Sequence, residues 1–324
     1  MTALVLGASG FLGSHITRQL AESGETVRVL ARPSSSLAAV EGLDIEVVRG
    51  DLGDPKALAG AMAGVDDVYY CIVDARAWIR DQQALVATNV GLLRTVIDVA
   101  VASGLRRFLY TSTLITMSDN APPCAYVDSR IAGERLVLDA ARERGLPAIV
   151  LCVANTYGRG DLLPTPHGRM VYDVALGRMP FYIRAAGTDV VGVEDAAAAF
   201  LLAADKGELG ERYLVAERQM TMREVFEAGA DAAGVEPPKR GLSPSTLMVA
   251  GALGGAWSAL SRRDVRLTRT SVRLMQARTS LDGSATRQAL GWTPRPTPDA
   301  IREGVLDYLE RRAARRSATT ATRS

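Results

Sequence analysis

A tyrosine and an arginine four residues apart are the side chains best suited to chemistry in this sequence. Tyr126 and Arg130 stand at i and i+4, so they share one face of the helix that we predict at 126–144. A phenol that gives or takes a proton needs its pKa lowered from about 10, and an adjacent fixed cation does this by favouring the phenolate. The hydroxyl of Thr113, thirteen residues before Tyr126, would hold a substrate oxygen. We therefore predict Thr113, Tyr126 and Arg130 as catalytic residues.

A glycine-rich segment near the start of the chain lies between a predicted strand and a predicted helix. GASGFLG spans residues 7–13. Gly7 permits a tight turn, Gly10 lets the backbone approach a pyrophosphate, and Gly13 lets the helix lie close to the sheet. The helix N-terminus adds free N–H groups and the positive end of its dipole. The segment predicts dinucleotide binding by Gly7, Ser9, Gly10, Phe11, Leu12 and Gly13.

The end of the second predicted strand indicates which dinucleotide binds. An NAD site usually has a carboxylate there for the ribose 2′-OH, whereas this chain has Ala31 followed by Arg32. Without the acid there is no repulsion of a 2′-phosphate, and an arginine offers it a planar fork of donors. We expect NADP(H) rather than NAD(H). A purely surface role for Arg32 is the alternative.

The strands that must position these residues are short apolar runs alternating with helical patterns. Nearly continuous apolar runs are typical of parallel strands buried on both faces. Six βα repeats predict an α/β fold, a Rossmann doubly wound parallel sheet with a smaller, mostly α-helical C-terminal substrate-binding part. The strands are expected at 3–7, 26–32, 45–51, 67–73, 107–113 and 148–154.

The alternation of strand and helix stops after residue 158, which sets the predicted domain boundary. A Gly- and Pro-rich loop follows, and one strand–helix pair then returns. We assign 1–158 plus about 188–208 to the dinucleotide-binding domain, and 159–187 plus about 209–312 to the substrate-binding part. The basic tail 313–324 is expected to be disordered.

Composition limits the classes of function. The 324 residues are 48% apolar and 23% charged with a net charge of +2, as in ordinary soluble proteins, and the basic excess is mostly in the tail. We expect no nucleic-acid partner. Three scattered cysteines and two histidines favour a reducing cytoplasm and no metal site, and a strand beginning almost at Met1 leaves no room for a signal peptide. The apolar segment 247–260 is too short to span a bilayer, so it is a packed helix, a wall for an apolar ligand or an interfacial contact.

Together these motifs resemble the extended short-chain dehydrogenases/reductases of the NAD-dependent epimerase/dehydratase superfamily. The similarity is greatest to the branch of dihydroflavonol reductases, 3β-hydroxysteroid dehydrogenases and hopanoid-associated sugar epimerases, and it covers nearly the whole chain. Besides GASGFLG it rests on GDLGD (50–54), TNVGLL (88–93), YTST (110–113), GVEDAAAA (192–199) and ALGWTPRPT (289–297).

The resemblance implies roles for further residues. The family's catalytic Ser/Thr, Tyr and Lys fall on Thr113, Tyr126 and Arg130. Arg32 falls at the position that binds the 2′-phosphate, and Asn89 resembles a helix asparagine of many members, although a structural role is at least as well supported. Other positions carried over to the cofactor are Asp51 and Leu52 at the adenine, and Cys71, Ile72, Val73, Thr111, Val153 and Asn155 nearer the nicotinamide.

The chain departs from the family pattern at several places. Arg130 replaces the lysine, YCIV (70–73) replaces HxAA, and CVANTYG (152–158) replaces RPxNVYG. The interval from Thr113 to Tyr126 is short for an extended member, which suggests a trimmed substrate-side loop. An arginine is always charged, so it can supply the electrostatic part of the lysine role, but it is a poorer proton relay.

The resemblance implies an NADP(H)-dependent oxidoreductase that interconverts a ketone and a secondary alcohol, with Tyr126 as proton donor and acceptor. A sugar epimerase or dehydratase that retains NAD is one alternative, and a non-catalytic NADP(H)-binding sensor or scaffold is another. We expect a small apolar substrate and a homodimer through helices 82–103 and 126–144. The residues expected at the substrate are Asp74, Trp78, Leu114, Asn155, Tyr157 and His167.

Overall fold

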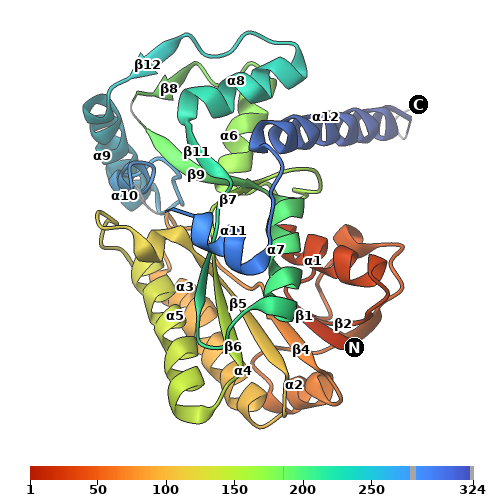
Figure 1. The fold of residues 1–324 in the computed structure, drawn as a ribbon. Helices are drawn as coiled ribbons and strands as arrows, with labels where there is room; N and C mark the ends of the chain where they lie inside the picture. Colours follow the sequence, from red (N-terminus) through yellow and green to blue (C-terminus); the bar gives the residue numbers. More distant parts are fainter. Residues whose placement is uncertain (185, 278–281, 322–324) are drawn as a thin grey trace.

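A seven-stranded parallel sheet forms the larger part of the molecule (Figure 1). The computed structural model describes residues 1–324 except 185, 278–281 and 322–324. The strand order is β10-β6-β5-β4-β1-β2-β3, so the chain reverses its direction of travel across the sheet between β1 and β4. The six predicted strands are confirmed as β1 (Thr2–Leu6), β2 (Thr26–Ala31), β3 (Glu46–Arg49), β4 (Asp67–Tyr70), β5 (Arg107–Thr113) and β6 (Ala148–Val153).

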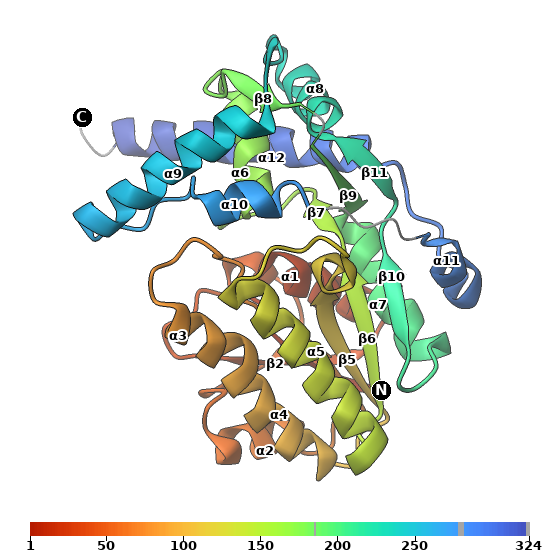
Figure 2. The same cartoon turned by 90° about the vertical axis from the view of Figure 1, so that its left-hand side faces the viewer.

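Helices cover both faces of this sheet because its strands are apolar on both sides. Alternate residues of one strand enter different cores, as Leu4 and Val5 of β1 do. Figure 2 shows α2, α4 and α5 in front of the sheet. The helices of this part are α1 (Phe11–Glu22), α2 (Pro55–Met62), α3 (Gln82–Val86), η2 (Ala87–Gly91), α4 (Leu92–Val101), α5 (Ala125–Arg144) and α7 (Val193–Lys206), with short turns η1 (Ala38–Val40) and η3 (Leu114–Met117). The predicted doubly wound α/β fold is confirmed.

The stretch Gln82–Val101, which joins α3, η2 and α4, is long and apolar enough by length and composition to cross a membrane. In the structure it lies against the sheet, where Leu93, Val96 and Ile97 enter a hydrophobic core. Its apolar character is therefore used in packing the Rossmann fold.

The smaller part lies over the carboxyl edge of the large sheet (Figure 1). Two short sheets, β11-β9-β7 and β12-β8, combine with helices around a separate core that includes Tyr172 and Phe226. Its elements are β7 (Asn155–Tyr157), α6 (Pro166–Ala175), β8 (Phe181–Ile183), β9 (Gly187–Gly192), β11 (Arg218–Thr221), α8 (Met222–Ala233), β12 (Arg240–Leu242), α9 (Pro244–Ser261), α10 (Arg269–Leu274) and α12 (Thr297–Ala321).

Three predicted boundaries need correction. β10 (Arg212–Val215), assigned to the substrate-binding part, is an edge strand of the large sheet beside β6, and α11 (Ser284–Leu290) packs near it. β9 pairs with β7 and β11 in the smaller part, so only α7 of the returning pair packs on the Rossmann sheet. The tail expected to be disordered continues α12 to Ala321, because Ala and Arg extend an existing helix at little cost, and 322–324 lie outside the described residues.

Candidate functional site

The glycine-rich segment turns from β1 into α1 through contacts that leave no room for side chains. Gly7 has a φ of +98°, and its carbonyl accepts a hydrogen bond of 2.9 Å from Gly10 N–H. A Cβ on Gly13 would lie 2.2 Å from the carbonyl oxygen of Gly7. Since real Cβ atoms do not approach an oxygen so closely, the helix can start this near the strand only with glycine at position 13.

The N-terminus of α1 is free to bind an anion. Gly10 is its N-cap residue and brings no side-chain acceptor, so the first amides of the helix are not capped by a side chain of their own cap residue. Ser9 and Gly10 are exposed, whereas Phe11 and Leu12 are partly buried. A close turn, a glycine cap and a helix dipole together fit the pyrophosphate of a dinucleotide.

The ends of β2 and β3 form the next part of this edge. Arg32 is exposed and its carbonyl accepts hydrogen bonds from Ser35 N–H at 2.9 Å and from the Arg49 guanidinium at 3.0 Å. Arg49 therefore fixes the turn that presents the Arg32 side chain. At the next strand end the Asp51 carboxylate accepts from Gly53 N–H at 2.7 Å, which holds Asp51 and the partly buried Leu52 in place.

Thr113 and Tyr126 meet at the carboxyl edge of the sheet. Thr113 is the last residue of β5, and Tyr126 is in the first turn of α5, the long helix that returns along the sheet. Burial raises the pKa of the Tyr126 phenol, while the Arg130 charge and a hydrogen bond with the Thr113 side chain lower it. The structure thus brings together the hydroxyl pair and the cation that the sequence predicts.

Arg130 is almost completely buried, which is unusual for an arginine. It is 1% exposed, and one guanidinium nitrogen donates to the carbonyl oxygen of Thr111. Its Cζ lies 5.5 Å from the ring centroid of Tyr110, while Nε and Nη1 have no hydrogen-bond partner. Within the described chain no carboxylate forms an ion pair with Arg130. A buried cation with so little compensation is costly to folding.

A hydrogen-bonded loop follows β4 on the other side of Tyr126. Asp74 N–H donates to Asn89 Oδ1 at 2.7 Å, and Asn89 Nδ2 donates to the Asp74 carbonyl at 3.0 Å and to Ser129 Oγ at 3.1 Å. Asn89 lies in the π-helical turn η2, a local widening that is frequent at functional sites. The buried Asn89 therefore ties the β4 loop to α5, so its role in the structure is positional.

The strand ends expected near the nicotinamide do lie side by side. Thr111 Oγ1 is 3.5 Å from Cys71 Sγ, and Thr113 is in register with Val153 of β6. Ile72 is partly buried and Val73 is exposed. Burial raises the pKa of the Cys71 thiol to about 12, which disfavours the thiolate.

Glu134 is a buried carboxylate that the sequence analysis missed. It lies two turns after Tyr126 on α5 and accepts hydrogen bonds from Ser112 and from Thr116, the latter at 2.8 Å. Arg212 of β10 pairs with its other oxygen at 3.0 Å. This network fixes the strand end that carries Thr113. The i+8 spacing from Tyr126 was the available signal, but the partner Arg212 is 78 residues away.

An apolar pocket of about 80 Å³ lies within the smaller part of the molecule. Of the residues predicted at the substrate, Asn155, Tyr157 and His167 line it together, with the Tyr157 and His167 rings 5.4 Å apart. Burial lowers the pKa of His167 to about 4, and its Nε2 has no hydrogen-bond partner. The remaining lining residues are Met170, Ala186, Gly187, Thr188, Met222, Val225, Phe226, Leu274, Met275 and Ala277.

The other residues predicted at the substrate do not line this pocket. The Asp74 carboxylate forms a bidentate pair with Arg76, with oxygen–nitrogen distances of 2.6 and 2.9 Å. Trp78 packs under the guanidinium of Arg266, and Leu114 is buried in the core beneath the sheet. Asn155, also predicted at the cofactor, donates to Thr188 Oγ1 at 2.7 Å and so lies on the pocket side.

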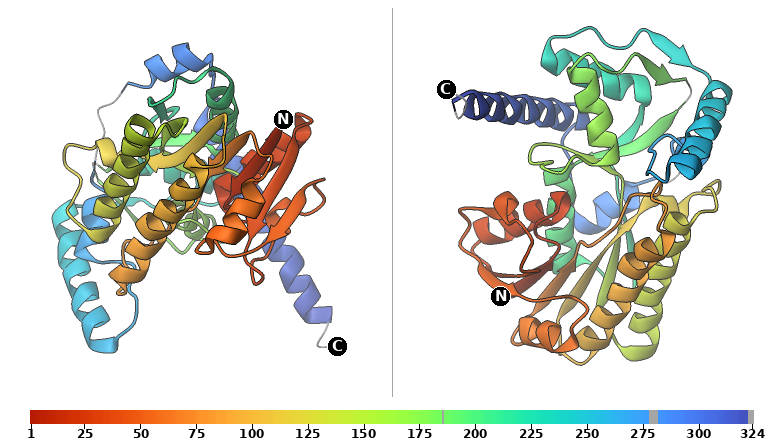
Figure 3. Two further views of the ribbon diagram at one scale, coloured as in Figure 1. Left: turned by 90° about the horizontal axis from the view of Figure 1, so that it is seen from below. Right: turned by 180° about the vertical axis from the view of Figure 1, so that it is seen from behind.

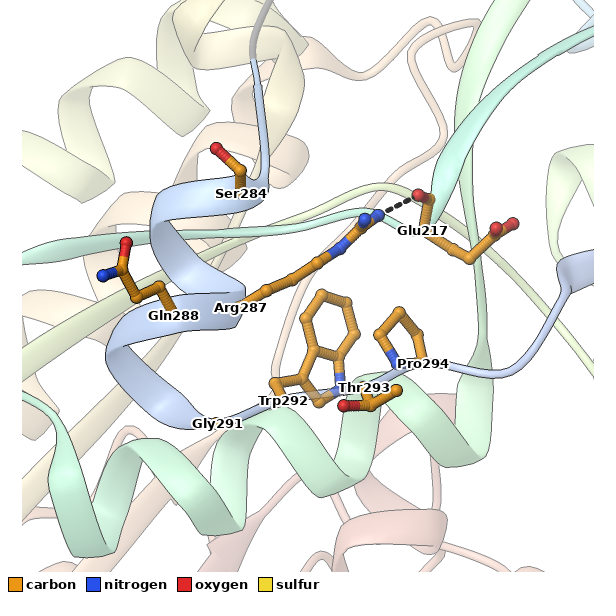
Figure 4. A pocket seen from close by; sticks show the side chains of 8 residues that line it. All are labelled: Glu217, Ser284, Arg287, Gln288, Gly291, Trp292, Thr293 and Pro294. Carbon is orange, nitrogen blue, oxygen red and sulfur yellow. Dashed lines mark hydrogen bonds between the residues drawn. The ribbon is translucent and has the colours of Figure 1, made fainter.

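A second, open hollow of about 580 Å³ lies away from these residues (Figure 4). It is an open notch between α11 and the segment after β10, and Arg287 crosses it to donate to the Glu217 carbonyl. None of the predicted site residues borders it. Its lining consists of Glu217, Ser284, Arg287, Gln288, Gly291, Trp292, Thr293 and Pro294. Among the described residues, no group of three or more His, Cys, Asp or Glu side chains is arranged to hold a metal ion.

A Rossmann sheet with a glycine turn and a Thr–Tyr pair at its carboxyl edge defines a dinucleotide-dependent class of protein. The sequence profile of the NAD dependent epimerase/dehydratase family matches residues 3–216, and the chain belongs to this family. It is 31% identical to the sterol demethylase protein B of Methylococcus capsulatus, over 96% of this chain and 99% of that protein. It is 30% identical to the ceramide reductase of Caulobacter vibrioides, over 93% and 88% of the two chains.

A solved structure described as that of gox2253 has the same fold, with a TM-score of 0.84 and 29% identity over 96% of this chain and 98% of the other. The family and its reductase members support an oxidoreductase that uses NAD or NADP. The resemblance to the epimerase/dehydratase superfamily inferred from the motifs is therefore confirmed.

Proposed function

We propose that the protein is an NADP(H)-dependent oxidoreductase that interconverts a ketone and a secondary alcohol on a small apolar substrate. The observation that carries this proposal is the contact between Tyr126 and Thr113 beside a buried Arg130. A phenol poised by a hydroxyl and a cation is suited to passing one proton to or from a substrate oxygen. When bound, the nicotinamide supplies or accepts the hydride.

Each residue has a distinct task in this proposal. Tyr126 gives its proton to the carbonyl oxygen during reduction and takes it back during oxidation. Thr113 donates a hydrogen bond to the same oxygen and stabilises the charge that develops on it. Arg130 favours the phenolate of Tyr126, and its Nε and Nη1, which have no partner, would donate to the ribose hydroxyls.

Two further features support the choice of cofactor and substrate. The exposed Arg32, on a turn fixed by Arg49, follows Ala31 where an NAD-specific site would have an acid. The pocket lined by Met170, Met222 and Phe226 has no cationic side chain in its lining, which favours an apolar substrate over a sugar nucleotide. The names of the sterol and ceramide relatives agree with apolar substrates. We extend the proposal to a homodimer through residues 82–103 and 126–144.

The test combines cofactor binding with turnover on a panel of hydrophobic ketones. Tyr126→Phe should lower turnover by about 10²–10⁴-fold while NADPH binds as in wild type, since only the acidic proton is removed. Tyr308→Phe is a matched control, because the Tyr308 ring stacks on Tyr172 at 4.2 Å in the smaller part and the substitution keeps the ring. Turnover that survives in Tyr126→Phe would contradict the proposed role. NADPH binding without turnover on any ketone would favour the non-catalytic sensor.

A further inference from the structure

The outward face of α9 is apolar and uncovered. Val249, Leu253, Trp257 and Leu260 are 64%, 68%, 61% and 79% exposed. Their spacing of four, four and three residues places them on one side of the helix. The 18 residues of α9 include no charged side chain. Figure 2 and the left view of Figure 3, where α9 is cyan, show the helix projecting from the body of the molecule.

The opposite face of α9 is packed, so the helix is fixed in this orientation. A Cβ on Gly254 would lie 2.1 Å from the Leu267 carbonyl oxygen, and one on Gly251 would lie 2.9 Å from that of Thr268. Ser258 Oγ donates to the carbonyl of Arg263 at 2.7 Å. The two glycines and Ser258 hold α9 against the returning chain, and its apolar outer face is left for another partner.

Arginines are concentrated in the segment that follows α9 and packs against its inner face. The segment 262–273 contains five arginines and one aspartate, a net charge of +4. All five arginine residues are exposed, and within the described chain none of them forms an ion pair. Arg262 ends α9 with a φ of +55°, and the chain then folds back so that Arg263, Arg266 and Arg269 stay near the helix.

We infer that α9 and the arginines of 262–273 dock on an anionic lipid bilayer. Exposed aliphatic side chains with a tryptophan among them suit insertion at the level of the acyl-chain boundary, and arginines beside them bind acidic headgroups. α9 does not have the length and hydropathy needed to span a bilayer. Among the described residues, only Gln82–Val101 has them. A second copy of the chain fits the surface less well, because two sets of five arginines would meet and repel.

The docking surface lies next to the apolar pocket. α10 packs on α9, and Leu274 at the end of α10 lines the pocket together with Met275. If the substrate is apolar, a step that rests on the proposed function, docking would bring the pocket to the membrane, where an apolar substrate dissolves. The docking itself is measured without turnover, so its failure would leave the proposed oxidoreductase activity untouched.

The experiment is co-sedimentation of the full chain with vesicles of phosphatidylcholine, with and without about one third phosphatidylglycerol. Wild type should bind the anionic vesicles, more weakly as salt increases, and bind phosphatidylcholine alone poorly. Leu253→Asn/Trp257→Asn should bind at least about tenfold more weakly. Arg263→Glu/Arg269→Glu should lose more than about fivefold per arginine removed. Leu163→Asn/Leu209→Asn, at exposed apolar positions elsewhere, is the control and should bind as wild type.

A second readout tests the site directly. The emission of Trp257 should shift to shorter wavelength on binding anionic vesicles. The shift should be much smaller in Trp257→Phe, because Trp292 is buried and Trp78 is partly buried under Arg266. Absence of vesicle binding by wild type, or equal binding by the α9 variants, would overturn the inference. So would a dimer in sedimentation velocity that Leu253→Asn/Trp257→Asn converts to monomer, since the face would then bind a second copy.

Discussion

The glycine turn at the carboxyl edge of the large sheet and the apolar pocket of the smaller part are built from different kinds of atoms. On the cofactor side the determinants are backbone atoms, such as the Gly7 carbonyl against Gly13 and the free amides at the start of α1. On the substrate side the pocket is made of side chains, from His167 on α6 to Phe226 on α8 and Met275 after α10. A dinucleotide phosphate is recognised by backbone geometry, whereas an apolar substrate is recognised by shape.

This difference predicts how each side tolerates substitution. Backbone recognition fails when the chain is displaced by a single methyl group, whatever the chemistry of that group. Side-chain recognition changes by degrees, since each apolar contact contributes a small part of the binding energy. Substitutions on the cofactor side should therefore abolish function, and those on the substrate side should alter selectivity.

The largest effect is expected from Gly13→Ala. The added Cβ would lie 2.2 Å from the Gly7 oxygen, so α1 must move away and its amides lose their position on the phosphates. We expect NADPH affinity to fall about 100-fold, or ~2.7 kcal/mol, and stability to fall by about 1–3 kcal/mol. Isothermal titration and urea unfolding measure the two effects.

Gly60→Ala is the matched control for that change. Gly60 is exposed in the last turn of α2, and a Cβ there would meet no atom within 4 Å. The same substitution should leave NADPH binding unchanged and stabilise the protein by up to about 1 kcal/mol through helix propensity. If both variants lost binding alike, backbone displacement at the glycine turn would not be the cause.

The next effect concerns Arg130. Arg130→Met keeps the length of the side chain but removes the charge that lowers the pKa of Tyr126, so that pKa should rise. The inflection in the pH profile of alcohol oxidation should then move to higher pH, and the rate at pH 7 should fall about tenfold or more. Arg130→Lys should keep the wild-type inflection.

Stability separates this role from a structural one. Arg130 is buried with two nitrogens that lack partners, so Arg130→Met should leave the melting temperature unchanged or raise it. Loss of activity together with a large loss of stability would indicate that Arg130 mainly holds the fold through Thr111.

A smaller effect is expected at Arg32, which lies at the far end of the cofactor side. Arg32→Glu places a carboxylate where NADP would carry its 2′-phosphate, so NADPH affinity should fall about tenfold. NADH has no such phosphate and should bind as well as before or better. Parallel titrations with both cofactors measure the selectivity. If NADPH and NADH lost affinity equally, Arg32 would have only a surface role in its loop and would not contact the 2′-phosphate.

The glycine turn and the grouping of Thr113, Tyr126 and Arg130 could be predicted from sequence because their signals are local. The residues 7–13 carry their own strand–turn–helix context, and Thr113, Tyr126 and Arg130 are connected by one loop and one helical turn. The pocket was predicted only in part. Asn155, Tyr157 and His167 were named, but the methionines and Phe226 come from segments whose packing has no local pattern.

Errors in the prediction have the same origin. Leu114, which was expected at the substrate, is buried in the core by the turn η3. β10 was assigned to the wrong part because its pairing with β6 joins residues about sixty apart, which composition cannot indicate. Glu134 was missed because only the tertiary fold brings Ser112 and Arg212 to it.

The smallest effect tests the substrate side at His167. Burial lowers its pKa to about 4, below the unfolded value near 6.5. Between these values the unfolded chain binds a proton that the folded chain does not, so His167 destabilises the protein as pH falls from 6.5 to 4. His167→Phe should remove this contribution, which is on the order of 1 kcal/mol at pH 5 for a partly exposed side chain.

Urea unfolding of wild type and His167→Phe at pH 7 and pH 5 isolates the contribution of His167 to stability. The comparison is needed because Asp161, whose pKa burial raises to about 6, acts with the opposite sign in the same range and is common to both proteins. The stability difference between the variant and wild type should grow in favour of the variant as pH falls. A constant difference would mean that His167 has the same pKa in the folded and unfolded chains, so that burial does not lower it.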